Sequence, residues 1–238
     1  GIKADFVLNF IKEDRWMLLA TGLGNTLKIT FVALIIGILL GSIVATVRST
    51  YDKNGADMSK RNKGGYVVLS IFNIICKLYL TVIRGTPMVV QLLIMYFIIF
   101  ASSKNGLMVA MIAFGINSGA YVAEIIRGGI MSIDNGQFEA GRSLGFNYGQ
   151  TMIYIIIPQV FKAVLPTLCN EFIVLLKETS VAGYIGIRDL TKGGDIIRAA
   201  TYSPFMPLIT VALIYLVMVV ILSALLGKLE RRLRRDER

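Results

Sequence analysis

Residues 137–158 read Gln-Phe-Glu-Ala-Gly-Arg-Ser-Leu-Gly-Phe-Asn-Tyr-Gly-Gln-Thr-Met-Ile-Tyr-Ile-Ile-Ile-Pro and form a polar segment between two long apolar stretches. Asp134, followed by Gln137, predicts a capping box at the start of a helix, and Gly145 stands where the C-cap would fall. Asn147, followed by Gln150, predicts a second helix that continues into the next apolar stretch. We therefore expect a rigid helix presented at a membrane surface, where a partner can bind it.

The composition indicates an all-α integral membrane protein. Apolar residues make up 55% of the 238 residues, and the mean hydropathy is +0.68. A soluble chain of this length could not bury so much apolar surface in one core. One crossing needs about 20 helical residues. Four stretches qualify, namely residues 29–47, 107–126, 151–176 and 205–227. A fifth crossing is expected to end near residue 101, after an interfacial segment at 66–78, which gives five transmembrane helices.

The basic residues predict the orientation of the chain. Thirteen of them fall in alternate loops that we assign to the cytoplasm: Arg48, Lys53, Lys60, Arg61, Lys63, Arg127, Arg142, Lys228, Arg231, Arg232, Arg234, Arg235 and Arg238. Seven fall on the other side: Lys3, Lys12, Arg15, Lys104, Arg188, Lys192 and Arg198. The positive-inside rule then places the N-terminus outside and the C-terminus inside. The net charge of +10 is thus explained by membrane topology, and we expect no binding of nucleic acid.

The domain organisation follows from these spans. We expect an extracytoplasmic segment at 1–16 with no cleaved signal peptide, a transmembrane domain at 17–228 and a basic cytoplasmic tail at 229–238. Residues 50–65 are charged and contain glycine, which predicts a flexible cytoplasmic loop. Gly37 and Gly41 form a GxxxG pair that favours close helix packing within the subunit. Pro158 and Pro166 are expected to bend the fourth span, and residues 183–203 are amphipathic, as in a surface helix.

Chemistry of its own is not predicted for this chain. It contains no histidine, and Cys76 and Cys169 do not form a CxxC pair, so we expect neither a metal site nor a disulfide. No Gly-x-x-x-x-Gly-Lys-Ser/Thr loop for phosphate is present. Any energy for transport must therefore come from a partner or from an ion gradient.

Several motifs resemble the permease subunits of ABC importers, in particular the polar amino acid uptake branch. Glu139-Ala140-Gly141, then Gly145, Ile155 and Ile157-Pro158, is similar to the EAA loop of these permeases. Arg84-Gly85-Thr86-Pro87 resembles the RGTP motif of that branch, and the segment 117–129, Asn-Ser-Gly-Ala-Tyr-Val-Ala-Glu-Ile-Ile-Arg-Gly-Gly, resembles its third span. Pro158-Gln159, Pro166, Asn170-Glu171-Phe172 and Leu176-Lys177-Glu178-Thr179-Ser180 resemble its fourth. The likeness covers about residues 17–228.

The resemblance implies a type I importer permease fold with a cytoplasmic coupling helix in a loop at about 128–150. It implies that a cytoplasmic ABC ATPase dimer binds this helix, that ATP and Mg are used by the ATPase and not by this chain, and that no cofactor is bound here. The implied coupling residues are Gln137, Glu139, Ala140, Gly141, Leu144 and Gly145. Gly141 replaces the usual second Ala, and is expected to make the helix about 1 kcal/mol less stable than Ala would.

The resemblance also implies other partners and a location. These are a second permease subunit, identical or homologous, an extracytoplasmic amino-acid-binding protein, and the lipid of a bacterial plasma membrane that the chain crosses several times. No cargo can be assigned from the motifs. A basic amino acid would suit the two span acids, Glu124 and Glu171, while glutamine, cystine and acidic amino acids remain alternatives.

Polar residues inside spans are candidates for the substrate pathway, because intramembrane charges usually face a cavity or a partner. The candidates are Arg84, Thr86, Asn117, Glu124, Asn170, Glu171 and Lys177. An alternative interpretation is structural, with Arg84–Glu124 or Lys177–Glu171 as internal ion pairs. Lys28, Lys77 and Lys162 are expected to extend to the membrane surface or to face a subunit interface.

Three other functions remain possible at this point. A self-sufficient secondary transporter or channel could use Glu124 and Glu171 as ion sites, although no internal repeat is visible. A membrane sensor or scaffold could bind another protein through the helix near Glu139. An ABC permease could also carry a sugar, a metal or a phosphonate, against which the motifs at 84–87 and 117–121 argue.

Overall fold

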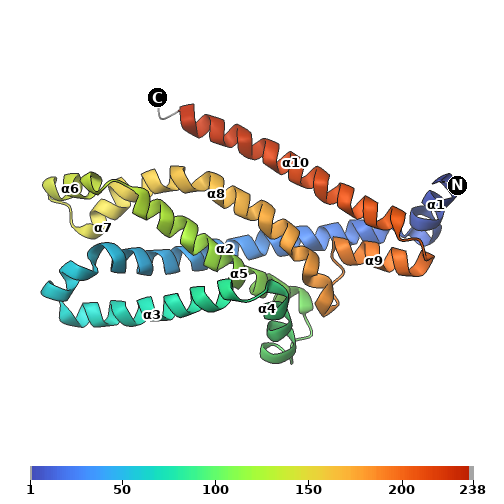
Figure 1. Cartoon of the computed structure of the whole chain (residues 1–238), viewed down its shortest axis with the longest axis horizontal. Coiled ribbons are helices and arrows are strands. Elements are labelled where there is room, and N and C mark those ends of the chain that lie inside the picture. Colours follow the sequence, from blue (N-terminus) through green and yellow to red (C-terminus); the bar gives the residue numbers. More distant parts are fainter. Residues whose placement is uncertain (1, 236–238) are drawn as a thin grey trace. The chain divides into compact units, whose positions relative to one another are not determined.

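The computed structural model describes residues 2–235, among which no strand occurs. The α-helices are α1 (Ile2–Phe6), α2 (Trp16–Arg61), α3 (Lys63–Gly85), α4 (Met88–Ile94), α5 (Gly106–Ser132), α6 (Asn135–Ser143), α7 (Tyr148–Thr151), α8 (Ile157–Glu178), α9 (Leu190–Thr201) and α10 (Phe205–Arg235), as Figure 1 shows. π-helical segments occur at Val7–Ile11, Met95–Ile99 and Met152–Ile156, and 3₁₀ segments at Lys12–Asp14 and Thr179–Ile185. Gly1 and residues 236–238 of the expected basic tail lie outside the described residues.

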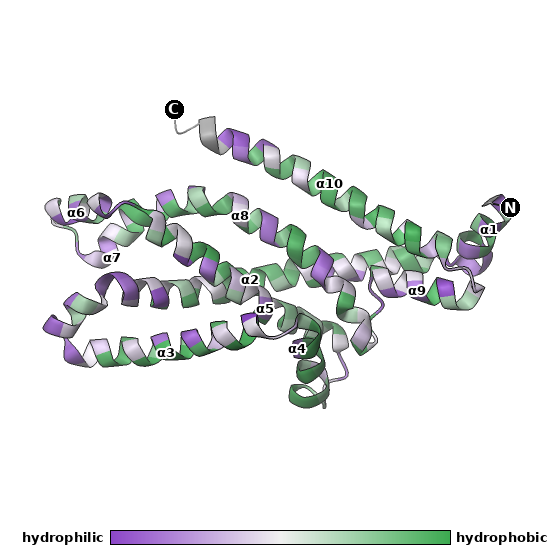
Figure 2. Cartoon of the chain, viewed as in Figure 1, coloured by the Kyte–Doolittle hydropathy of each residue, from purple (hydrophilic) through white to green (hydrophobic). Residues whose placement is uncertain are grey.

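Five helical stretches among the described residues are long and apolar enough to cross a membrane, as predicted. They are Trp16–Arg61, Lys63–Gly85, Gly106–Ser132, Tyr148–Ile185 and Phe205–Arg232. Figure 2 shows the hydrophobic colouring along most of α10, and the hydrophilic colouring at the C-terminal end of α2 and around α6 and α7. The chain therefore has the hydropathy pattern of a multi-pass membrane protein.

The second span was predicted in the wrong place. It is α3, which ends at Gly85, whereas an interfacial segment was predicted at 66–78 with the span after it. Pro87 explains the break, since a proline lacks the amide hydrogen and forces the preceding residue out of the helical region. Thr86 is accordingly extended, at φ −123° and ψ 147°. The apolar residues that follow form a separate short helix over Met88–Ile99.

The chain divides into two compact units. The first comprises residues up to Ile35, Pro87–Gly115 and Phe172–Lys228, and the second comprises Ile36–Thr86, Ile116–Glu171 and the residues from Leu229 onward. The long helices α2, α5 and α8 each contribute to both units. The polar segment at 137–158 lies within the second unit.

The segment at 183–203 belongs to the first unit and contains a helix, α9, as predicted. Asp189 caps α9 and accepts hydrogen bonds from the backbone amides of Thr191 and Lys192 at 3.1 and 3.2 Å. Its side chain is fully buried, and this burial raises the pKa of the Asp189 carboxyl, against the opposing effect of the two amides. The backbone amide of Leu190 also donates to Thr26 Oγ1 at 3.1 Å. The start of α9 is therefore fixed to α2.

Gly22 allows this close contact. A Cβ atom at Gly22 would lie 2.5 Å from the carbonyl oxygen of Asp189 and 2.9 Å from the Cα of Leu190. Both contacts are with backbone, which cannot move aside as a side-chain end can. At Gly24, two residues further along α2, a Cβ would meet nothing within 4 Å.

We predict that Gly22→Ala lowers the unfolding temperature of the purified protein in detergent, because the backbones of α2 and α9 must separate. Gly24→Ala is the matched control and should leave this temperature unchanged or raise it, since Ala is about 1 kcal/mol better than Gly within a helix. Thermal unfolding of the two variants beside the unchanged protein measures the difference. Equal unfolding temperatures for both variants would contradict the described contact.

The second unit begins with a helical hairpin. α3 runs back beside the C-terminal half of α2 (Figure 1), and Arg48 Nη1 donates to Asn73 Oδ1 at 2.8 Å between them. The prediction of a flexible loop at 50–65 was wrong, because α2 continues to Arg61 and Asn62 caps α3. The stacked rings of Tyr51 and Tyr66 and the cap at Asn62 order this turn. A helix of 46 residues is about 69 Å long, far more than one crossing requires.

Small residues bring α2 and α5 together in this unit, as the GxxxG pair predicts. A Cβ at Gly37 would lie 2.9 Å from Ser118 Oγ, and one at Gly41 would lie 2.6 Å from a methyl group of Val122. The Tyr79 hydroxyl of α3 donates to the carbonyl oxygen of Ile116 on α5 at 2.5 Å. The close contacts of Gly37 and Gly41 are thus within one chain.

Candidate functional site

The short helix α6 begins and ends with strong local signals. Asp134 is its N-cap, but its side chain accepts from the amide of Gly136 at 2.6 Å and not from that of Gln137. The predicted capping box with Gln137 is therefore wrong, and Gln137 Oε1 instead accepts from Gln159 Nε2 at 3.2 Å. Gly145 has φ +77°, a conformation that glycine adopts without strain.

The hydrogen bonds at the end of α6 form a Schellman motif. The amide of Phe146 donates to the carbonyl of Gly141 at 3.0 Å, and that of Gly145 to the carbonyl of Arg142 at 2.9 Å. The complete capping box predicted for Asn147 and Gln150 is present, with both bonds at 2.9 Å. This turn therefore has a fixed geometry.

The two faces of α6 differ in exposure. Phe138 and Gly141 are buried, and Phe138 belongs to an apolar cluster with Ile130, Met152 and Ile156. The other predicted coupling residues are on the outside: Gln137, Glu139, Ala140, Leu144 and Gly145. Leu144 is a large apolar side chain and is 69% exposed. The outer face of α6 therefore combines a carboxylate, a small residue and an apolar residue.

Gly141 packs against its own chain. A Cβ atom there would lie 2.5 Å from Oγ1 and 2.6 Å from Cγ2 of Thr151, whose side chain is buried. Thr151 is stiff because it is β-branched, and its hydroxyl is already bonded to the carbonyl of Asn147. The expectation that Ala would be the more stable residue at 141 is wrong, since the clash outweighs the difference in helix propensity.

We predict that Gly141→Ala loosens α6, so that backbone amides of residues 135–151 exchange hydrogen faster than in the unchanged protein. The double variant Gly141→Ala/Thr151→Ala should recover most of the protection, because it removes the atoms that clash. Gly128→Ala, where a Cβ meets nothing within 4 Å, is the control. Unchanged exchange in Gly141→Ala would refute the contact.

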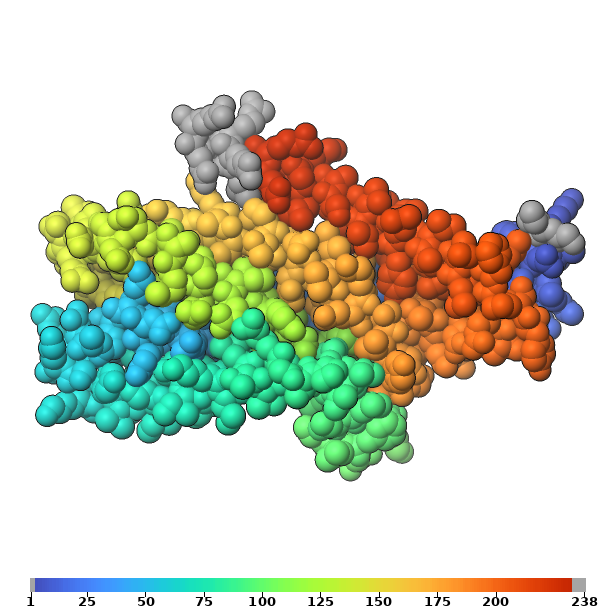
Figure 3. All heavy atoms as spheres, in the orientation of Figure 1, coloured from blue at the N-terminus to red at the C-terminus, as the bar shows by residue number. Residues whose placement is uncertain are grey.

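The end of α2 contacts α6 directly. Lys53 Nζ donates to Asn135 Oδ1 at 2.8 Å and lies 5.1 Å from the centre of the Phe138 ring. In the space-filling view the atoms of this end of α2 abut those of α6 and α7 (Figure 3). A cavity of about 680 Å³ lies here, and Asp57, Arg61 and Glu139 are among its lining residues. The hairpin therefore supports the helix from one side.

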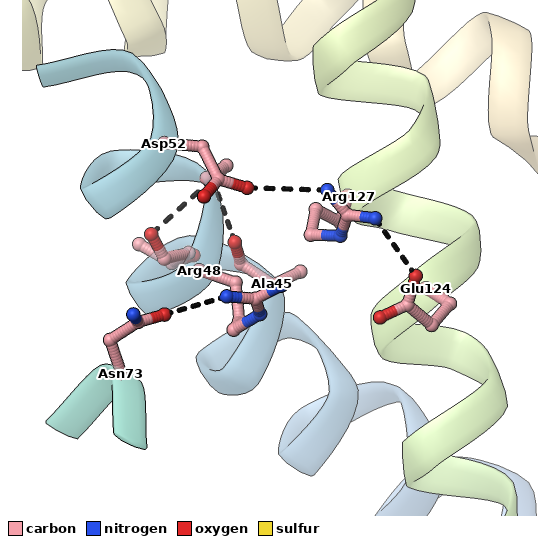
Figure 4. Close-up of polar contacts among 8 residues, drawn as sticks. Ala45, Arg48, Asp52, Asn73, Glu124 and Arg127 are labelled. Atoms are coloured by element: carbon pink, nitrogen blue, oxygen red, sulfur yellow. Dashed lines mark hydrogen bonds and ion pairs between the residues drawn. The ribbon is translucent and has the colours of Figure 1, made fainter. Parts of the chain in front are cut away.

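A network of charges lies deeper in the second unit. Arg127 on α5 forms an ion pair with Glu124 at 3.1 Å, one turn earlier, and another with Asp52 on α2 at 3.2 Å. Figure 4 shows Arg127 between the two carboxylates, with Arg48 bonded to Asn73 beside them. The partner of Glu124 is thus Arg127. The alternative interpretation, an Arg84–Glu124 ion pair, is wrong.

Arg84 and Glu124 nevertheless line the same cavity, of about 490 Å³. The guanidinium of Arg84 lies 5.9 Å from the centre of the Tyr121 ring, at cation–π distance. The remaining lining residues are Arg48, Lys77, Leu80, Thr81 and Gly85. Lys77 is exposed and lines this cavity, and the expectation that it reaches the membrane surface or faces an interface stays a prediction.

The other predicted pathway residues have varied environments. Glu171 is buried and accepts a hydrogen bond from Ser118 Oγ at 3.1 Å, and Asn117 is buried beside Ser118. Asn170 is exposed, whereas Glu171 is buried. Adjacent residues of a helix point in different directions, so the two side chains do not share one environment. Thr86 Oγ1 donates to the carbonyl of Val82 at 2.8 Å. Lys177 is exposed and lies in the first unit.

Four polar residues of the second unit were not among the predicted site candidates: Arg48, Asp52, Lys77 and Ser118. Lys77 and Arg84 are seven residues apart, which places them on one face of α3, so helical spacing could have found Lys77. Arg48 and Asp52 belong to another helix, and no spacing indicates their neighbours. Within residues 2–235 no group of three metal-ligating side chains is present.

Comparisons with known proteins show the family of the chain. The family described as binding-protein-dependent transport system inner membrane component matches residues 37–235. The chain belongs to this family. It is 38% identical over 220 residues to the arginine transport system permease protein ArtQ of Bacillus subtilis (strain 168), covering 91% of this chain and 92% of ArtQ. It is also 34% identical to the glutamine transport system permease protein GlnP of Escherichia coli (strain K12), over 91% and 93% of the two chains.

Solved structures confirm the fold of an ABC importer permease. A crystal structure of an amino acid ABC transporter with histidines matches with a TM-score of 0.79 and 41% identity, covering 94% of this chain and 98% of that one. An inward-facing structure of the MetNI methionine ABC transporter matches with a TM-score of 0.72 at 18% identity, over 92% and 97%, which supports the fold alone. The chain is thus a multi-pass permease subunit of the type I fold, and its named relatives are permeases rather than enzymes.

Proposed function

We propose that this permease forms the translocation pathway of an ATP-driven importer for polar amino acids. In this account a cytoplasmic ATPase dimer binds the outer face of α6, and ATP with Mg is used there and not by this chain. A second permease subunit completes the pathway, and an extracytoplasmic binding protein delivers the cargo. The N-terminus lies outside and the C-terminus in the cytoplasm of a bacterial plasma membrane.

The observation that carries the proposal is the construction of α6. Its inner face is fixed by Phe138 and Gly141, and its ends by Asp134 and the Schellman motif, so its outer face moves with the helices around it. A force applied to Glu139 or Leu144 therefore reaches α5 and α8 without being lost in a flexible loop. The names of the relatives, which are arginine, glutamine and cystine permeases, support amino acids as cargo.

The proposal is tested by purifying the chain from its native membrane in mild detergent and identifying the proteins that accompany it by mass spectrometry. An ABC ATPase subunit should be retained, and the complex reconstituted in liposomes should take up amino acids only with ATP. Purified chain without ATPase that still drives uptake would overturn the proposal in favour of a secondary transporter.

Glu139→Arg reverses the one negative charge of α6 and is predicted to reduce ATP-driven uptake by at least about tenfold, because an interfacial charge reversal costs several kcal/mol. The side chain of Glu139 is exposed, so the unfolding temperature should not change. Uptake and thermal unfolding are measured on the same preparation.

Glu230→Arg is the matched control, since it makes the same substitution in a different helix, α10. It should retain the ATPase and normal uptake. Uptake by Glu139→Arg equal to that of Glu230→Arg would exclude Glu139 from coupling.

A further inference from the structure

The cavity between α2, α3 and α5 has an excess of positive charge. Arg48, Lys77 and Arg84 line it, and Glu124 is its one acidic lining residue. Glu124 is already paired with Arg127, which is in turn paired with Asp52. The cavity and the ion pairs next to it thus contain four cations, Arg48, Lys77, Arg84 and Arg127, and two carboxylates, Glu124 and Asp52. Two positive charges are therefore uncompensated.

The cations of the cavity are not committed to carboxylates of the chain. Among the described residues, neither Lys77 nor Arg84 forms an ion pair, and Arg84 is held by the ring of Tyr121. Arg48 bonds Asn73 through Nη1, while its Nε is buried without a hydrogen-bond partner. Buried donors are ordinarily satisfied, so a buried donor beside a cavity indicates an acceptor from outside the chain.

Lys77 and Arg84 belong to α3, a helix with the length and composition of a membrane span, whereas Arg48 lies in α2 just beyond the predicted crossing at 29–47. A charge within a span is costly, and such residues ordinarily mark a substrate path. Guanidinium and ammonium groups bind carboxylates through charge-assisted hydrogen bonds. A cargo with a second cationic group would instead meet like charge, because the one carboxylate of the cavity is occupied by Arg127.

We propose that this cavity binds carboxylates of the transported amino acid, and that the permease favours cargo with two carboxylates over neutral and, above all, cationic amino acids. This inference rests on the proposed function and narrows its substrate class. It reverses the expectation that Glu124 and Glu171 suit a basic cargo, since Glu124 is paired and Glu171 is bonded to Ser118.

The test is direct binding of radiolabelled glutamate, glutamine and arginine to the permease complex purified from its native membrane, without the extracytoplasmic binding protein. We expect glutamate to bind most tightly and arginine least. Lys77→Gln and Arg84→Gln should each weaken glutamate binding by about tenfold, the loss of one charged hydrogen bond, and should not weaken arginine binding. Lys63→Gln, at the start of α3 and outside the cavity, should change neither.

A charge-reversal variant is expected to gain affinity for a ligand, which a misfolded protein would not do. Lys77→Glu should raise the affinity for arginine and lower that for glutamate. Tighter binding of arginine than of glutamate by the unchanged complex would overturn the inference. So would an equal loss of all three ligands in both glutamine variants, which would indicate a structural role only.

A lipid headgroup is the other source of an anion in a membrane. Mass spectrometry of co-purified lipid distinguishes it, because loss of an anionic lipid in Arg84→Gln with unchanged glutamate binding would also overturn the inference. ATP-driven uptake of any amino acid, measured on the same complex, separates the two proposals. Without such uptake the proposed function fails, whereas uptake with a preference for arginine contradicts only the charge selectivity.

Discussion

Gly141 of α6 lies directly against Thr151 of α7, and this approach fixes the polar turn of the chain onto the fourth span. The orientation of α6 depends on this contact. A nine-residue helix has little stability of its own in water, so its orientation comes from packing and caps. Because the buried glycine permits that packing, Glu139 and Leu144 are held in place on the opposite face.

The same principle of close backbone approach recurs through the chain. In α2, Gly22 lets the start of α9 pack closely, and Gly37 and Gly41 let α5 pack closely. Apolar side chains alone give little driving force for association in lipid, so small residues that let helices approach closely are favoured. Charged groups inside the second unit are paired in a chain from Asp52 to Glu124 through Arg127.

Short-range signals predicted the local structure well. The capping box of Asn147 and Gln150 and the left-handed Gly145 depend on residues within one turn, so the sequence contains all that determines them. Four of the five spans followed from hydropathy, while the second was misplaced because Pro87 was not taken as its end. The helix at 50–61 was missed because it is stabilised partly by contacts of Lys53 with Asn135 and with the ring of Phe138, and both of these residues are distant in sequence.

The candidate site was only partly predictable, for the same reason. The outer face of α6 was found, but the role of Gly141 depends on Thr151, a partner that lies beyond the turn. Glu124 was matched with Arg84 across spans although Arg127, three residues later on the same helix, was the nearer choice. Which cations share a cavity depends on the packing of three helices, and no sequence spacing gives that.

The most direct test of the account is a photoreactive amino acid at position 144, on the exposed end of α6, in cells that make the whole transporter. Illumination should link the chain to an ABC ATPase subunit, and the same probe at the 94% exposed position 202 should not. Linkage to lipid or to another protein at position 144, with no ATPase product, would contradict the claim that α6 is the coupling helix.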